Sequence, residues 1–154
     1  TLTTYDETLC GILEPNVCTT KRRYEVLKAC QERGIPTVVW LCPILPYIND
    51  TEANLRGILD YCLDAGVQGI VNFGFGVTLR EGNRAYFYAQ LDRHFPGMKE
   101  QYIRRFGEAY NCLSPRHGRL ARIFEETQGF MHRPEEIFAY LNAFPEAYEQ
   151  LRLI

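Results

Sequence analysis

The chain has 154 residues, enough for one domain with a substantial hydrophobic core. Hydrophobic residues make up 46% of it and charged residues 23%, which is typical of an ordinary globular protein. The formal net charge of −2 gives no basic surface for nucleic acid, and no apolar run approaches the roughly 20 residues of a membrane span, so we expect a cytoplasmic protein.

The chain opens with the run "TLTTYD", which has strand-forming residues and no initiator methionine. We expect this run to be a β-strand that begins in the middle of a sheet. A domain that opens in this way is typical of a piece of a longer protein, or of a protein cut inside a domain.

Two later segments repeat one plan, an amphipathic helix followed by a short apolar strand. "TTKRRYEVLKACQERG" has Thr20 as its candidate cap and precedes the strand "IPTVVWLCP". "DTEANLRGILDYCLDAG" has Asp50 or Thr51 as its cap and precedes the strand "VQGIVNFGFG". The glycines at 34 and 66 predict the two helix ends. Together with the opening run, the pattern predicts three adjacent parallel strands with right-handed crossovers.

After Gly76 the sequence predicts helices. The four helical segments are "NRAYFYAQLDRHFPG", "MKEQYIRRFGEAY", "SPRHGRLARIFEETQG" and "RPEEIFAYLNAF". Ser114 with Pro115 behind it predicts a helix start, as does Pro134. The fold class is therefore α/β: residues 1–76 are expected to form half of a partial (β/α) TIM-like barrel, and residues 77–154 a helical extension packed on it.

Polar residues gather at the predicted carboxyl ends of the three strands, the edge where parallel α/β sheets bind ligands. The candidate ligand-binding residues are Thr3, Thr4, Cys42, Pro43, Asn49, Asp50 and Arg80. Several have a purely structural alternative. Asp50 can cap a helix, Asn49 can close a turn, and Pro43 can stiffen a loop.

Cysteine and histidine spacing predicts no metal site in this chain. None of the six cysteines forms a C-x-x-C pair, which favours reduced thiols that act as small apolar side chains. The histidines at 94, 117 and 132 lie outside the strand ends. No nucleophile elbow or P-loop occurs, and "GFG" lacks the third glycine of a dinucleotide fingerprint. The residues alone therefore name no reaction.

Several motifs together resemble the C-terminal half of the radical S-adenosylmethionine proteins related to spore photoproduct lyase. They are the Glu14-Pro15 turn, an arginine in the next helix, the P-I-x-P-x-x-N-D loop that begins at Pro43, and "GFGVTLREGNRAYFY". The later "YNCLSPRHGRLARIFEET" and "IFAYL" also match, so the resemblance covers nearly the whole chain.

The resemblance implies a partial (β/α)₆ barrel in which Thr3, Thr4 and the Cys42–Asp50 loop face S-adenosylmethionine. The family holds a [4Fe–4S] cluster with C-x₃-C-x₂-C, but the nearest cysteines here, Cys10 and Cys18, are separated by seven residues. We therefore expect a fragment of an enzyme that forms a 5′-deoxyadenosyl radical, with the cluster held by a missing N-terminal half. The fragment alone is expected to bind no cluster and to be inactive.

Two other functions stay open on the residues: a non-catalytic α/β module for assembly or regulation, and an unrelated α/β enzyme that binds a phosphorylated metabolite near "GFG". The expected partners are the missing half and, through the open edge of "TLTTY", a second copy of the chain. No membrane partner is expected, and a nucleic-acid substrate is suggested by the family alone, since the charge indicates no basic face.

Overall fold

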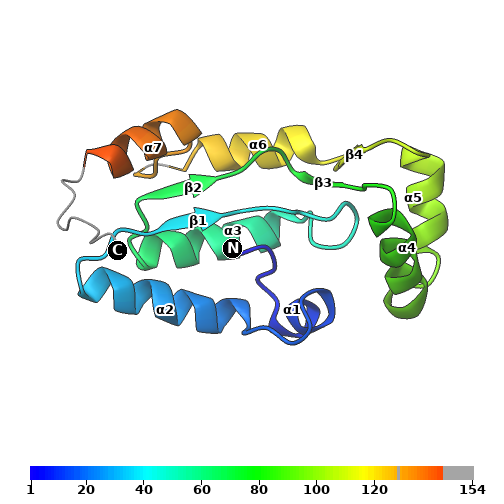
Figure 1. Ribbon diagram of the computed structural model, residues 1–154, viewed down its shortest axis with the longest axis horizontal. Coiled ribbons are helices and arrows are strands. Elements are labelled where there is room, and N and C mark those ends of the chain that lie inside the picture. Colours follow the sequence, from blue (N-terminus) through cyan, green and yellow to red (C-terminus); the bar gives the residue numbers. More distant parts are fainter. Residues whose placement is uncertain (128, 144–154) are drawn as a thin grey trace, which may run out of the picture.

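The computed structural model describes residues 1–127 and 129–143. Its helices, in chain order, are α1 (Glu7–Leu13), α2 (Thr20–Glu32), α3 (Glu52–Asp64), α4 (Asn83–His94), α5 (Met98–Phe106), α6 (His117–Glu125) and α7 (Pro134–Asn142). Its strands are β1 (Val38–Trp40), β2 (Gly69–Val71), β3 (Gly76–Thr78) and β4 (Asn111–Leu113). In Figure 1, β1 and β2 run through the middle of the molecule, with α2 on one side, α6 and α7 on the other, and α4 with α5 at one end.

The two central strands pair in parallel, as predicted. Val39 lies opposite Ile70, and Leu41 continues the ladder by donating its N–H to the Val71 carbonyl at 2.8 Å. On the far side of β2, Ile70 donates to the Met131 carbonyl at 2.9 Å. The parallel arrangement places the residues that follow β1 and β2 at one common edge.

The prediction of a third parallel strand at "TLTTY" is wrong. Residues 1–5 run beside β1, and Leu2 donates its N–H to the Trp40 carbonyl at 3.1 Å, but they form no strand. The reason is that side chains replace the ladder. The Thr3 carbonyl accepts from the side-chain amides of Asn49 and Asn54, at 3.0 and 2.9 Å.

The strand expected at "VQGIVNFGFG" is the shorter β2, and Gly76, the last residue of that run, begins β3, which belongs to a different sheet. β3 pairs antiparallel with β4, which lies in the region predicted to be helical, so that prediction is corrected here. Gly76 makes the pair possible. A Cβ at this position would lie 2.5 Å from the Cys112 carbonyl oxygen, so a side chain would force the two backbones apart.

Helices α2 and α3 confirm the predicted helices, with the α2 cap one residue earlier than predicted and the α3 cap at the second of its two predicted positions. Thr19, one residue before the predicted cap, accepts from the Arg22 N–H at 3.4 Å, because Thr20 is buried and turned toward Cys10. Thr51 caps α3 by accepting from the Asn54 N–H at 3.1 Å. Asp50 is therefore not the cap, and its carboxylate is used elsewhere.

The four helices predicted after Gly76 are confirmed as α4 to α7. The third begins at His117 rather than at Ser114, because the Ser114 N–H still continues the strand pairing by donating to the Phe75 carbonyl at 2.8 Å. Residues 144–154, the end of the expected extension, lie outside the described residues. Within the described part, no helix is long and apolar enough to cross a membrane.

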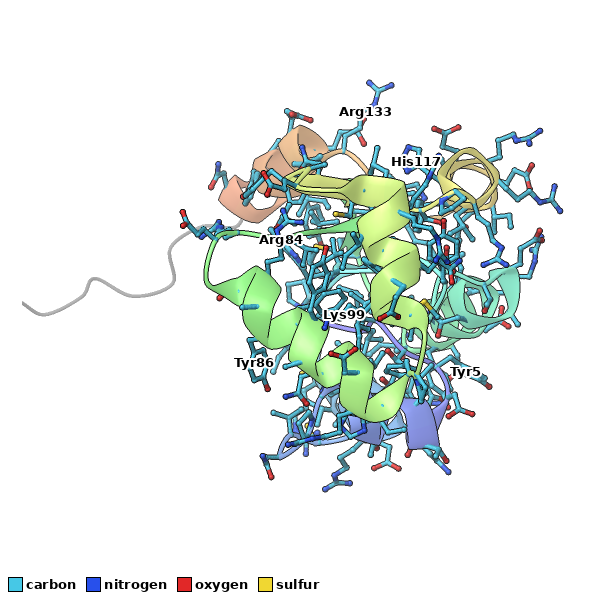
Figure 2. All side chains as sticks on the ribbon, turned by 90° about the vertical axis from the view of Figure 1, so that its right-hand side faces the viewer. Tyr5, Arg84, Tyr86, Lys99, His117 and Arg133 are labelled. Carbon is cyan, nitrogen blue, oxygen red and sulfur yellow. The ribbon has the colours of Figure 1, made fainter. Side chains whose placement is uncertain are left out.

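Two apolar clusters form the core. The larger packs β1 and β2 against α2, α3 and α6, with Leu41, Ile58 and Leu120 fully buried. The smaller lies around Tyr102 at the end of the molecule formed by α4 and α5, which faces the viewer in Figure 2; Tyr86 points outward from α4 there. The fold of the described residues is thus mixed α/β with two two-stranded sheets, and these residues do not close a barrel.

Candidate functional site

A buried amide joins the loop after β1 to the N-terminal segment. Asn49 is 2% exposed, and its Nδ2 donates to the Thr3 carbonyl at 3.0 Å and to Thr4 Oγ1 at 3.1 Å. Its Oδ1 accepts from the Leu45 N–H at 2.5 Å, which closes the loop on itself. Because these bonds occupy both ends of the amide, Asn49 fixes the loop against residues 1–5.

A carboxylate links the same segment to α2. Glu14 accepts from Thr3 Oγ1 at 2.9 Å through one oxygen and forms an ion pair with Arg23 at 2.7 Å through the other. The hydrogen bond to Glu14 raises the pKa of the Arg23 guanidinium above its ordinary value. Arg23 also donates to the Thr1 carbonyl at 3.1 Å, so this pair anchors the start of the chain.

Asp50 reaches in the opposite direction, toward the segment before α6. Its carboxylate is fully buried; one oxygen accepts from Ser114 Oγ at 2.5 Å and the other from Arg116 Nη1 at 2.9 Å. Ser114 Oγ in turn accepts from the Arg116 N–H at 2.9 Å. Asp50 therefore ties the loop after β1 to the end of β4.

An open hollow, which we call the strand-end pocket, lies where the two sheets meet. Its volume is about 720 Å³, and its lining includes Trp40, Cys42, Pro43, Phe73, Arg80 and Tyr110. Small-molecule sites are typically about 300 to 1,000 Å³, so the pocket has the size of one. Trp40 lines it because its neighbours Val39 and Leu41 point into the core, which turns the side chain between them to the opposite face.

The two ends of the pocket differ chemically. At the end formed by β1 and β2, the rings of Trp40 and Phe73 lie 5.1 Å apart and are 43% and 66% exposed. At the end formed by β3 and β4, Arg80 Nε donates to Tyr110 Oη at 3.3 Å. The Arg80 cation lowers the pKa of the Tyr110 phenol through this bond, whereas burial raises the pKa of the Cys42 thiol between the two ends.

The glycine-rich turn offers little to a phosphate. The Gly74 N–H donates to Asn72 Oδ1 at 2.7 Å, and the Phe75 N–H donates to His117 Nδ1 at 3.2 Å. Phosphate-binding loops work by presenting free backbone N–H groups to the ligand. Both N–H groups are already occupied here, and Figure 2 shows His117 at the start of α6.

The structure separates the seven predicted site residues into two groups. Four of them are 5% exposed or less and have protein partners: Thr3, Thr4, Asn49 and Asp50. Three line the strand-end pocket: Cys42, Pro43 and Arg80. Cys42 and Phe73, which follow β1 and β2, both line the pocket, whereas Thr3 is not among the lining residues.

Sequence reasoning missed two kinds of residue. Ser114 and Arg116 were assigned only to a helix start, and their contact with Asp50 joins residues more than sixty positions apart. Trp40 was taken as part of an apolar strand, although strand alternation next to two core residues indicates that it faces outward. Within residues 1–127 and 129–143, no three histidine, cysteine, aspartate or glutamate side chains converge on a possible metal site.

Comparison with known proteins gives a partial match. No protein-family model matches the chain, and no solved structure does. The chain is 28% identical over 90 residues to the uncharacterized protein Mb2609c of Mycobacterium bovis and to the uncharacterized proteins Rv2578c and MT2655 of two Mycobacterium tuberculosis strains. The match covers 58% of this chain and 26% of each relative. The chain is therefore similar to about a quarter of longer mycobacterial proteins whose names state no activity.

Proposed function

We propose that the chain is the C-terminal half of the partial (β/α) barrel of a radical S-adenosylmethionine enzyme related to spore photoproduct lyase. The observation that carries the proposal is that the separate motifs of the resemblance contact one another. Glu14 of the Glu-Pro turn pairs with Arg23 of the next helix, Asn49 of the proline-rich loop bonds to Thr4, and Asp50 bonds to Ser114.

The described residues do not fit the iron–sulfur cluster, because no three of their cysteines converge. The cluster would be held by the other half of the enzyme. When bound, the cluster and S-adenosylmethionine supply a 5′-deoxyadenosyl radical that abstracts hydrogen from the substrate. The residues of this chain would position that cofactor rather than react.

S-adenosylmethionine would bind at the edge of the pocket that carries Cys42 and Pro43. The pocket is large enough, and the loop that contributes this edge is fixed at both of its sides, by Asn49 on the N-terminal segment and by Asp50 on Ser114. Thr3 and Thr4 already form hydrogen bonds within the chain, so their proposed role is to hold this edge in place. Arg80 lies at the opposite, β3–β4 end of the pocket.

The test uses the full-length parent protein, reconstituted without oxygen with iron and sulfide, then supplied with S-adenosylmethionine and a reductant. We expect release of 5′-deoxyadenosine, and none from the 154-residue chain treated in the same way. The matched control is the parent with one cysteine of the upstream C-x₃-C-x₂-C replaced by alanine. A parent that lacks this triplet, or that carries an intact cluster and releases no 5′-deoxyadenosine, would refute the proposal.

A further inference from the structure

The strand-end pocket contains a recognition surface that the cofactor proposal does not use. Its β1–β2 end exposes two aromatic rings, those of Trp40 and Phe73, and its β3–β4 end exposes the guanidinium of Arg80. The polar side chains of Thr78, Tyr110 and Asn111 surround the second end. A ligand that fills this pocket has to be complementary to both ends.

The aromatic end suits a flat, apolar group. Trp40 ends β1 and Phe73 lies just after β2, and their ring planes are inclined by 59° with the centroids 5.1 Å apart. Exposed aromatic side chains that gather at one place mark binding sites, since each ring presents a large apolar face to water. Leu113, which is 49% exposed, adds apolar surface to the lining.

The other end suits an anion. Arg80 is the charged residue in the lining, and no described carboxylate forms an ion pair with it. Glu81, the next residue, lines a neighbouring hollow instead. Because the described bond of Arg80 uses Nε, its terminal nitrogens are free to bind a carboxylate or a phosphate through two parallel hydrogen bonds. The Tyr110 hydroxyl accepts from Arg80, so its own proton is also available to a ligand.

We propose that the strand-end pocket binds the substrate of the enzyme, and that this substrate carries a planar ring at one end and an anionic group at the other. The ring packs on Trp40 and Phe73, and the anion binds Arg80 with Tyr110. That this ligand is the substrate rests on the proposed function, whereas the ligand site itself is inferred from the pocket alone. Cys42 and Pro43 line the same pocket, so such a ligand would lie beside the cofactor edge.

Trp40 is the one tryptophan of the sequence, so its fluorescence reports on this pocket directly. The probes are 4-(4-nitrophenyl)butyrate and 4-(4-nitrophenyl)butan-1-ol, which share a ring and a chain length and differ in the anionic group. Each is titrated into the 154-residue chain, and quenching of Trp40 gives its dissociation constant. We expect the acid to bind at least about tenfold more tightly than the alcohol, as a charged hydrogen bond would require.

Arg80→Gln should remove the preference for the acid and leave the affinity for the alcohol unchanged. Phe73→Leu should weaken both probes to a similar degree. The matched control is Arg119→Gln, which removes a guanidinium outside the pocket lining, on α6 where it pairs with Glu52, and should change neither affinity. Circular dichroism checks that each variant folds. If a variant does not fold, the comparison of acid with alcohol on the unmodified chain still tests the inference.

Equal affinity for acid and alcohol, or an acid preference that survives in folded Arg80→Gln, would overturn the inference. Absence of binding by either probe would also overturn it. These outcomes are separate from the test of the proposed function. A parent that releases 5′-deoxyadenosine while the chain ignores the probes refutes only the substrate site, and the reverse result refutes only the radical chemistry.

Discussion

Replacing Asn49 by alanine should destabilise the chain strongly, because this amide connects the loop after β1 with residues 1–5. Asn49 is 2% exposed and forms hydrogen bonds with the Leu45 N–H, the Thr3 carbonyl and Thr4 Oγ1. The Thr3 carbonyl keeps Asn54 as a second donor after the substitution. The Leu45 N–H loses its described partner, and Thr4 Oγ1 loses one bond but keeps its 3.4 Å contact with Thr3 Oγ1.

The magnitude follows from these losses. A buried polar group left without a partner costs about 1–3 kcal/mol and a lost hydrogen bond about 1 kcal/mol, so the Leu45 N–H and the lost Thr4 bond together give about 3 kcal/mol in the free energy of unfolding. For a chain of this size, that corresponds to a fall in melting temperature of roughly 6–12 °C. Chemical denaturation followed by Trp40 fluorescence and by circular dichroism measures the free energy directly.

The matched control is Asn111→Ala. Asn111 is an exposed asparagine on β4 whose side chain forms no hydrogen bond with the described residues, so we expect a change within about 0.5 kcal/mol. A loss below about 1 kcal/mol for Asn49→Ala would contradict the reasoning, since it would mean that water or a rearranged loop replaces these bonds at little cost.

Three further outcomes are expected. Gly76→Ala should cost about 1–3 kcal/mol in unfolding free energy, because its Cβ would lie 2.5 Å from the Cys112 carbonyl oxygen. Gly11→Ala, whose Cβ would have no atom within 4 Å, is the control and should be neutral or slightly stabilising. Equal effects of the two substitutions would refute the close approach of β3 and β4. Burial raises the pKa of Cys62 from 9.0 to about 12, so its thiol stays protonated in the folded chain. The protonated thiol therefore contributes stability below pH 9, and this contribution is lost as the pH rises toward 12. Iodoacetamide near neutral pH should therefore label the exposed Cys18 and spare Cys62, as mass spectrometry would show, and equal labelling of both in the folded chain would contradict this. Residues 1–5 form no strand and the Thr3 carbonyl is occupied, so the two-fold dimer is expected through the apolar surface beside them rather than through a strand edge; a monomer at high micromolar concentration in light scattering would refute this.

The helices and the central parallel pair could be predicted because their signals are local. Apolar spacing of three and four residues, threonine caps and the glycines at 34 and 66 lie within the elements that they specify, and α2 and α3 formed within a residue or two of the predicted ends. The two-stranded parallel pair followed from the repeat of helix and strand. The cap at Thr19 instead of Thr20 is a choice between adjacent hydroxyls, which burial of Thr20 against Cys10 decides.

Tertiary contacts alone decided the remaining features. "TLTTY" has the composition of a strand, yet the side-chain amides of Asn49 and Asn54 take the carbonyl that a neighbouring strand would have used. "NCL", between two predicted helices, became β4 because Gly76, more than thirty residues earlier, lets a second backbone approach.

The candidate site divides in the same way. From the sequence, Thr3, Thr4, Asn49 and Asp50 could be recognised as polar residues near strand ends, which is a property of their position in the chain. Whether each side chain faces a ligand or a protein partner depends on residues far away in sequence, such as Ser114 for Asp50. The sequence by itself thus determined which helices form and where polar residues cluster, because those signals are local. Only the tertiary structure decided that these four polar residues are buried in protein contacts while Trp40, Phe73 and Arg80 stay exposed in the pocket, because burial is set by long-range packing.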